Sequence, residues 1–370
     1  MKRVTSLRSP YGALVTATAI DRMKWFFVIL LSVSLLHTTA VAAENPAAPS
    51  VEVDHQRIRN AVEKSLLLLE RGSADSAEKR PCFTCHSQAL PVLAITAARD
   101  HGFKIDKANL RRQLDHTADF LSRGKENYVA GKGQGGRIDT AGYALWTLQA
   151  GKHKPDDVTA AVADYVLQTN ADSDHWTHSS NRPPTEASDF TTTYVALRGL
   201  AAFATAEQRT RITQRQNTVV QWLLKTSTSD TEDRVFQLRS LAFAQAETEA
   251  QQTFADALIT AQRPDGGWAQ KDDMTSDAYA TGTVLASLAQ TGHVTPASAV
   301  YQRGLQFLLK SQKADGSWLV ESRSKPFQEY FETGFPHGVN QFVSTSATAW
   351  ATIALIESLA KPARKSSVAK

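Results

Sequence analysis

Two cysteines and a histidine are the residues whose types and spacing most clearly could do chemistry. Cys82 and Cys85 are the only cysteines of the 370-residue chain, and His86 follows the second one directly. Two thiols at this spacing can add to the vinyl groups of one porphyrin, while the adjacent imidazole ligates the iron. The pattern therefore predicts covalently bound haem c, with His86 as the proximal iron ligand.

Two other uses of these residues stay open. Cys82 and Cys85 could form a disulfide or a thiol-redox pair, although no strand–helix–strand pattern of a thioredoxin-like site surrounds them. Zinc is the weaker alternative, because a closed zinc site needs four ligands and this stretch supplies three.

Residues 1–43 have the order of a secretory signal peptide. Lys24 precedes the apolar run FFVILLSVSLL, and the small residues TTAVAA follow it. The run is too short to cross a bilayer comfortably, and this order is typical of a cleaved export signal. We therefore expect a periplasmic or secreted protein with a linker over residues 44–52 and no integral membrane span after cleavage.

Charge and compartment limit the partners. Residues 1–43 hold five basic residues and one acid, which accounts for the net charge of +4 of the whole chain. The remainder is near neutral, so no nucleic-acid partner is expected. Free thiols do not persist in an oxidising compartment, which favours a bonded state of both cysteines. The expected partner is a periplasmic redox protein or an apolar small molecule.

Beyond the linker the chain repeats a helix pair about every 45–50 residues. The first helix of each unit has one apolar stripe and therefore lies at the surface. The second is rich in Ala, Gly, Ser and Thr, nearly free of charge, and therefore buried on all sides. The first helices are expected at 53–71, 107–123, 155–169, 206–225, 249–262 and 297–312. The second helices are expected at 88–100, 139–150, 188–203, 233–247, 277–291 and 344–360.

Six outer and six inner helices predict an all-α fold. We expect a closed α6/α6 toroid over residues 53–362, followed by a disordered tail at 363–370. An open solenoid is the alternative, but the inner helices are too uniformly apolar for an open surface. Each inner helix follows an outer one through a single loop, so the inner helices run parallel and their starts converge on one rim. Four residues there are expected to be N-caps: Asp139, Asp189, Asp277 and Ser344.

The C-x-x-C-H stretch precedes the first inner helix, so the haem is expected at this rim. His337 is the preferred sixth iron ligand, because it precedes the last inner helix, which neighbours the first in a closed ring. Met274, His175 and His178 are further candidates on rim loops. An open sixth position would instead favour small-ligand or peroxide chemistry.

Two loops share a pattern of glutamine, a turn with glycine, and tryptophan. They are LITAQRPDGGWAQ (258–270) and LLKSQKADGSWLV (308–320), with a weaker copy over 170–176. Their positions are similar to the Q-and-W repeats of squalene–hopene cyclases and to the prenyltransferase β-subunit repeat: Gln262, Gly266, Trp268, Gln312, Gly316 and Trp318. The resemblance implies that these six residues are structural and that the fold is the toroid of that superfamily.

The resemblance does not extend to the chemistry. Squalene cyclases protonate an alkene with an Asp-x-Asp-Asp acid, and neither 271–274 nor 171–175 has this pattern. The inner helices are expected to be poor in aromatic residues, and the prenyltransferase zinc set is missing. The sequence therefore favours a haem-c toroid for electron transfer or haem-assisted redox chemistry. The alternatives are a non-catalytic binding or scaffold module with a Cys82–Cys85 disulfide and a divergent terpenoid cyclase-like enzyme.

Overall fold

The computed structural model describes residues 53–325 and 329–361. The expected signal peptide, linker and disordered tail lie outside the described residues. Within these residues no helix is both long and apolar enough to cross a membrane.

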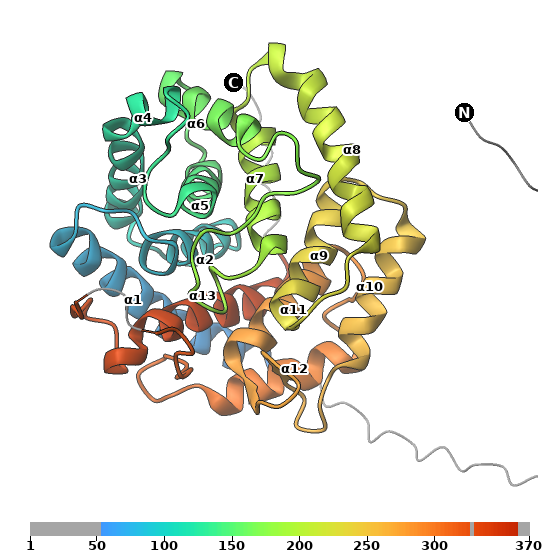
Figure 1. Ribbon diagram of the computed structural model, residues 1–370. Coiled ribbons are helices and arrows are strands. Elements are labelled where there is room, and N and C mark those ends of the chain that lie inside the picture. Colours follow the sequence, from blue (N-terminus) through green and yellow to red (C-terminus); the bar gives the residue numbers. More distant parts are fainter. Residues whose placement is uncertain (1–52, 326–328, 362–370) are drawn as a thin grey trace, which may run out of the picture. The chain divides into compact units, whose positions relative to one another are not determined.

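Six amphipathic helices form an outer layer (Figure 1). Each buries one face, as in α3, where Leu110, Thr117 and Leu121 point inward between exposed charged residues. Their bounds are α1 (His55–Lys79), α3 (Lys107–Arg123), α6 (Asp157–Gln168), α8 (Arg209–Lys225), α10 (Thr248–Thr260) and α12 (Ala299–Ser311).

Six further helices form the inner layer, and most of their residues are buried. They are α2 (Leu90–Asp100), α5 (Arg137–Ala150), α7 (Asp189–Phe203), α9 (Thr231–Phe243), α11 (Ala278–Gln290) and α13 (Gln341–Glu357). Small residues allow them to pack closely. A Cβ atom on Gly142 of α5 would lie 2.4 Å from the Val195 side chain of α7, and one on Gly282 of α11 would lie 2.6 Å from the backbone nitrogen of Ala351 in α13.

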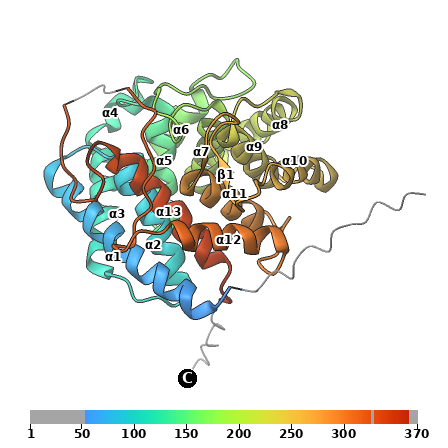
Figure 2. The same ribbon diagram turned by 90° about the horizontal axis from the view of Figure 1, so that it is seen from below.

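The last pair packs against the first and closes the ring. Helix α13 lies against α11, α1 and α2, and Figure 2 shows α13, α1 and α2 side by side. Gln312 donates its side-chain N–H to the carbonyl of Ala61 at 2.9 Å, and the hydroxyls of Ser65 and Thr352 are 2.7 Å apart. The prediction of an all-α toroid is therefore confirmed, and the open solenoid is wrong.

Short elements connect the pairs. They are the π-helix Cys85–Ala89, α4 (Lys125–Val129), the 3₁₀ turns Ala206–Gln208 and Gly338–Asn340, and the paired strands β1 (Trp268–Ala269) and β2 (Ser276–Asp277).

Several expected helix starts differ from those in the structure. Helix α9 starts at Thr231, capped by Asp230, and α7 is capped by Ser188 instead of Asp189. Asp277 does cap α11, whereas Asp139 and Ser344 lie inside their helices. The reason is tertiary, because Asp139 accepts hydrogen bonds from a neighbouring loop instead of its own helix.

Candidate functional site

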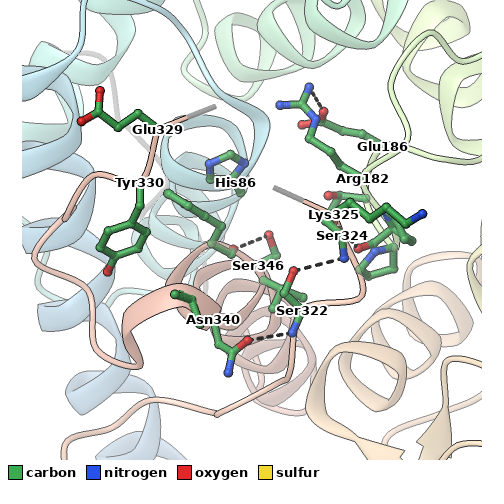
Figure 3. Close-up of a pocket in the computed structure, with 16 residues that line it drawn as sticks. His86, Arg182, Glu186, Ser322, Ser324, Lys325, Glu329, Tyr330, Asn340 and Ser346 are labelled. Carbon is green, nitrogen blue, oxygen red and sulfur yellow. Dashed lines mark hydrogen bonds and ion pairs between the residues drawn. The ribbon is translucent and has the colours of Figure 1, made fainter. Parts of the chain in front are cut away.

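A pocket of about 370 Å³ opens at the rim where the inner helices start. Residues 182–186 of the α6–α7 loop and 322–325 of the α12–α13 loop cover it, and the start of α13 forms another wall with Phe342 and Val343 (Figure 3). The exposed surface of the lining is mostly apolar, although most of the lining residues carry a polar or charged group. This composition is typical of a pocket for an organic ligand.

Two carboxyl groups of the described residues border this pocket, and Glu186 is the more buried of them. The residue is 2% exposed. Its backbone pairs with that of Arg182 through two hydrogen bonds of 3.0 and 3.1 Å, and the two side chains form an ion pair. Burial raises the pKa of Glu186, and Arg182 and a hydrogen bond from the Cys85 thiol oppose this rise only in part. The guanidinium thus limits the shift and stabilises the ionised carboxylate, the form that can accept a proton.

Asp139 fixes the loop that carries Glu186. It lies in the first turn of α5 and is 2% exposed. The backbone N–H groups of Ser179 and Ser180 donate to its Oδ2 at 2.9 and 3.3 Å, and Thr192 donates to its Oδ1. A buried carboxylate with several donors holds its partners in one arrangement. Asp139 therefore positions the wall of the pocket.

His86 lines the same pocket from the π-helix. Its ring packs edge-on against Phe342 with centroids 4.8 Å apart. Its Nε2 atom is shielded from solvent and has no hydrogen-bond partner among the described residues. Burial, together with the positive charge of Arg182, lowers the pKa of His86 to about 3. The imidazole is therefore neutral at physiological pH.

The three residues of the C-x-x-C-H stretch do not meet in one cavity. His86 suits an iron ligand, because its Nε2 is free of protein partners. The Cys85 thiol instead donates to Glu186. Burial raises the pKa of the thiol most, and the negative charge of Glu186 raises it further. Cys82 is exposed and borders a different surface depression, with Phe83. As these side chains lie, they do not fit a haem held by two thioethers and His86.

The alternatives for the two cysteines meet the same geometry. Both thiols are free, so the structure does not contain the Cys82–Cys85 disulfide. Among the described residues no group of three His, Cys, Asp or Glu side chains is arranged to hold a metal ion. The haem interpretation stays a prediction of the sequence, and no step proposed below runs through it.

A second buried carboxyl lies at the start of α9, and sequence reasoning missed it. The stretch from Asp230 to Asp233 has the order Asp-Thr-Glu-Asp. This order differs from the Asp-x-Asp-Asp acid of squalene cyclases by one methylene group, at Glu232. A search that admits either acid at the third position would have found it.

Glu232 is held by two hydroxyl groups in a sealed site. Thr191 donates to its Oε1 at 2.9 Å and Tyr279 donates to its Oε2 at 3.0 Å. Burial raises the pKa of Glu232 well above its ordinary value of 4.5, and the charge of Asp230 raises it further. Burial therefore favours the protonated form of Glu232, which can donate a proton.

Pro184 separates Glu232 from the rim pocket. The space beside Glu232 has no room for a water molecule, and Pro184 borders both this space and the pocket. Arg323 also borders the space beside Glu232, where it donates to Gln270 at 2.8 Å. A shift of the turn at 182–186 would join the two spaces.

Aromatic side chains of the inner helices meet around the ring axis beside Glu232. Tyr143 stacks on Trp146 with centroids 6.1 Å apart, and Trp146 lies 6.3 Å from Trp350. Phe236 lies 6.4 Å from Trp350. The expectation of a ring interior poor in aromatics is wrong. Helix α2 supplies no aromatic residue and the other inner helices supply one to three each, but closure of the ring brings them together.

The expected sixth iron ligands lie away from His86. His337 has a left-handed backbone conformation with φ of 86°, and its Nε2 is 2.7 Å from the Ser317 hydroxyl. His175 stacks on Trp222 at 4.3 Å. Two others are engaged elsewhere, His178 with Asp189 at 2.6 Å and Met274 through its backbone carbonyl with Arg263. None of these four residues lines the pocket beside His86.

The six repeat residues lie at the joints between helix pairs. Trp268 and Trp318 are each 1% exposed and donate Nε1–H to the carbonyls of Leu258 and Leu308 at 2.7 and 2.8 Å. Gly266 and Gly316 have φ of +87° and +94°, and Cβ atoms there would lie 2.6 and 2.7 Å from backbone atoms of the next outer helix. Gln262 and Gln312 each bridge their own turn and that next helix.

Solved structures share this fold. The type II terpene cyclase MstE from Scytonema, without ligand, matches with a TM-score of 0.53 at 14% identity, covering 82% of this chain and 98% of that chain. A protein from Actinoplanes matches with a TM-score of 0.53 at 12% identity, covering 81% of this chain and 99% of that chain. Identities this low show the fold alone.

A curated relative matches a shorter stretch. Lanosterol synthase erg7A of Aspergillus fumigatus is 38% identical over 96 residues, which are 26% of this chain and 12% of the synthase. The chain therefore spans only a small part of that enzyme.

The family comparison covers far more of the chain. The squalene-hopene cyclase C-terminal domain family matches residues 93–370. Because this match extends over more than half of the sequence, the chain belongs to the squalene-hopene cyclase C-terminal domain family.

Proposed function

We propose that this protein is a divergent terpenoid cyclase-like enzyme that protonates an alkene, with Glu232 as the acid. The observation that carries the proposal is a buried carboxyl with a raised pKa, in an Asp-x-Glu-Asp stretch at the start of an inner helix. Hydroxyl donors on both of its oxygens hold the group in one orientation. Orientation of the acid matters because a proton is transferred only over hydrogen-bonding distance.

The proposed step is redox-neutral. The O–H bond of Glu232 breaks, a C–H bond forms at one alkene carbon, and the positive charge remains on the other carbon. Attack by a further alkene forms a C–C bond and closes a ring. The aromatic faces of Tyr143 and Trp350 supply the negative quadrupole that stabilises such a cation.

The reaction ends when the last cation loses a proton. Glu186 is suited to accept it, because Arg182 favours its ionised form. Glu186 then releases that proton to solvent and Glu232 takes one up from solvent, so both carboxyls return to their starting states. The pKa of both carboxyls is raised by burial, but Arg182 limits the rise at Glu186, whereas Asp230 adds to it at Glu232. Two carboxyls whose environments separate their pKa values are the usual basis for assigning an acid and a base.

The rim pocket is the proposed entrance for an apolar, unsaturated chain. The exposed surface of its lining is mostly apolar, and Arg182 lies beside Glu186 at one side of it (Figure 3). Contact between substrate and Glu232 requires that Pro184 move aside, because it lies between the two spaces. The substrate would supply the binding energy for that shift.

The test offers the purified full chain two probes, squalene and the geranylgeranyl dihydroxybenzoate that is the substrate of the MstE complex. Mass spectrometry should find a product of unchanged mass in H₂O that gains one deuterium in D₂O. The Glu232→Gln variant should form it about 10²–10⁴ times more slowly, the usual contribution of a positioned general acid.

A matched control is Glu249→Gln, which changes an exposed glutamate on the outer helix α10. It should keep the full rate. Undiminished turnover by Glu232→Gln would refute the assignment of the acid, and no conversion of either probe by the unchanged protein would refute the substrate class.

The haem interpretation is separated from this proposal by an absorption spectrum. Protein exported from a host with haem-c maturation machinery should be extracted with acid–acetone. A Soret band that stays with the polypeptide would establish the haem bond to Cys82 and Cys85, and would place a cofactor where the substrate is proposed to enter. A colourless protein with cyclase activity would leave Glu232 as the functional centre.

A further inference from the structure

Two arginines lie where the inner helices approach their ends, and neither forms an ion pair within the described residues. They are Arg198 on α7 and Arg239 on α9. Arg239 is 5% exposed. A buried guanidinium loses much of its hydration, so its charge needs compensation from the surroundings.

The hydrogen bonds of both arginines go to neutral groups. Both share the hydroxyl of Tyr194, which is 3.0 Å from Arg198 and 3.2 Å from Arg239. Arg198 also donates twice to Gln149, and Arg239 donates to Gln290 at 2.8 Å. The Nε and Nη1 atoms of Arg239 have no partner among the described residues. Two positive charges thus converge on one phenol oxygen. Burial raises the pKa of Tyr194, but the two guanidinium groups outweigh it and lower the pKa overall.

Aromatic rings compensate only part of this charge. The guanidinium carbon of Arg239 is 5.1 Å from the Tyr194 ring centroid and 5.3 Å from that of Trp350. Arg198 is 5.1 Å from the Trp146 ring. A cation–π contact contributes about 0.5–2 kcal/mol, less than a buried charge loses in hydration. Both arginines precede the last turn of their helices, where the dipole effect is strongest.

One carboxyl lies in the second layer around the pair. Glu357 accepts from the amide of Gln290 at 2.8 Å, and the same Gln290 accepts from Arg239 through its oxygen. The amide therefore stands between this acid and the arginine. A cavity of about 190 Å³, open to solvent, lies beside both guanidinium groups and Phe243.

We propose that this cavity is an anion site for a phosphate-type oxyanion, free or as the head group of a larger molecule. Arg198 and Arg239 would donate their remaining N–H groups to it, because each guanidinium carries five donors and uses only some of them here. Planar guanidinium groups bind such anions with two parallel hydrogen bonds. This site is distinct from Glu232, which lies seven residues before Arg239 on α9, about 10 Å along the helix.

The experiment titrates the full chain with inorganic pyrophosphate in buffer free of phosphate and sulfate. The melting temperature should rise with ligand concentration, because a ligand that binds the folded state stabilises it. Tryptophan fluorescence should change in parallel, since Trp146 and Trp350 contact the two arginines. Sodium chloride at equal ionic strength should produce neither effect.

Three variants test the site. Arg198→Gln should weaken pyrophosphate binding about tenfold or more, the effect of losing charged hydrogen bonds. Arg234→Gln, which makes the same charge change near the start of α9, should bind as the unchanged protein does. Gln149→Glu supplies a carboxylate directly to Arg198, so it should raise the melting temperature without ligand and abolish the pyrophosphate response.

A prenyl diphosphate identifies the form of the anion. Binding about tenfold tighter than pyrophosphate would assign the site to a head group, and equal binding would assign it to the free anion; both support the site. A pyrophosphate response that persists in Arg198→Gln, or no response in the unchanged protein, would overturn the proposal. So would a phenolate absorbance near neutral pH that Tyr194→Phe removes, because the counter-charge would then be Tyr194 itself.

Discussion

The two ends of the ring hold opposite chemistry. At the rim where the inner helices start lie four buried acids: Asp139, Glu186, Glu232 and Asp233. Toward the other end lie Arg198 and Arg239, which form no ion pair with an acid among the described residues. Because all inner helices run parallel, their dipoles add, with positive ends at the first rim and negative ends at the second. This difference shows that a ring built from one repeated helix pair can carry buried acids at one end and arginines at the other, while the architecture stays the same.

Helix α9 shows the arrangement within a single element. Glu232, Phe236 and Arg239 follow each other at spacings of four and three, so they lie on one face of the helix. That face carries an acid, an aromatic ring and a base in turn. On α5, which α7 separates from α9 in the ring, Asp139, Tyr143, Trp146 and Gln149 repeat the order with an amide in place of the base. The aromatic layer therefore separates the acidic end from the basic one.

Removal of this aromatic layer should have the largest effect on stability. Trp350 is 1% exposed and contacts Trp146, Phe236 and Arg239. We expect Trp350→Ala to lower the free energy of unfolding by about 3–5 kcal/mol, as large truncations in a core do. Denaturant unfolding measures this loss.

The matched truncations are Trp268→Ala and Trp318→Ala, at joints between helix pairs, and each should also cost about 3–5 kcal/mol. They leave the axis intact, so the pyrophosphate response should survive in them and weaken in Trp350→Ala. An equal response in all three variants would contradict the view that the aromatic layer supports Arg239, and a loss below about 1 kcal/mol in both joint variants would contradict their burial.

The protonation of Glu232 should appear in the pH dependence of stability. Its folded pKa is raised above the ordinary value of 4.5, so above that pH the folded chain holds a proton that the unfolded chain releases. This group therefore lowers the free energy of unfolding by about 1.4 kcal/mol for each pH unit between the two pKa values. Glu232→Gln cannot titrate and should lack this loss.

The measurement is a series of denaturant unfolding curves between pH 5 and pH 8. The variant should gain on the unchanged protein as the pH rises, and Glu249→Gln should not. A constant difference between Glu232→Gln and the unchanged protein across this range would show that Glu232 is ionised in the folded state. That result would also remove it as the proton donor.

The sequence predicted the fold well because the signals are local. Apolar periodicity, small residues and the glutamine–tryptophan loops each lie within a few turns of chain. The functional groups depend on distant contacts. Nothing near Cys85 in the sequence indicates that its thiol meets Glu186, about a hundred residues later. Sequence spacing placed Cys82, Cys85 and His86 together, whereas packing directs Cys82 outward and Cys85 inward.

His86, at the acidic end of the ring, should also make the stability depend on pH, but with the opposite sign to Glu232. Its folded pKa is about 3 and its ordinary value is 6.5, so below pH 6.5 the unfolded chain binds a proton that the folded chain does not. The free energy of unfolding therefore decreases as the pH falls from 6.5 toward 3, by at most about 1.4 kcal/mol per pH unit from this group. His86→Gln should reduce the loss, and His55→Gln, at an exposed position at the start of α1, should not.

Unfolding curves between pH 4 and pH 6.5 give the two slopes. The Glu232 effect begins above pH 4.5 and overlaps this window, but the two slopes have opposite signs: Glu232 lowers the stability as the pH rises, and His86 lowers it as the pH falls. Each single variant removes only one slope, and the double variant should show the sum of both changes. An unchanged slope in His86→Gln would mean that the imidazole is solvated when the protein is folded. The pocket wall at His86 would then be open to water, and the apolar substrate proposed for it would lose its dry surface.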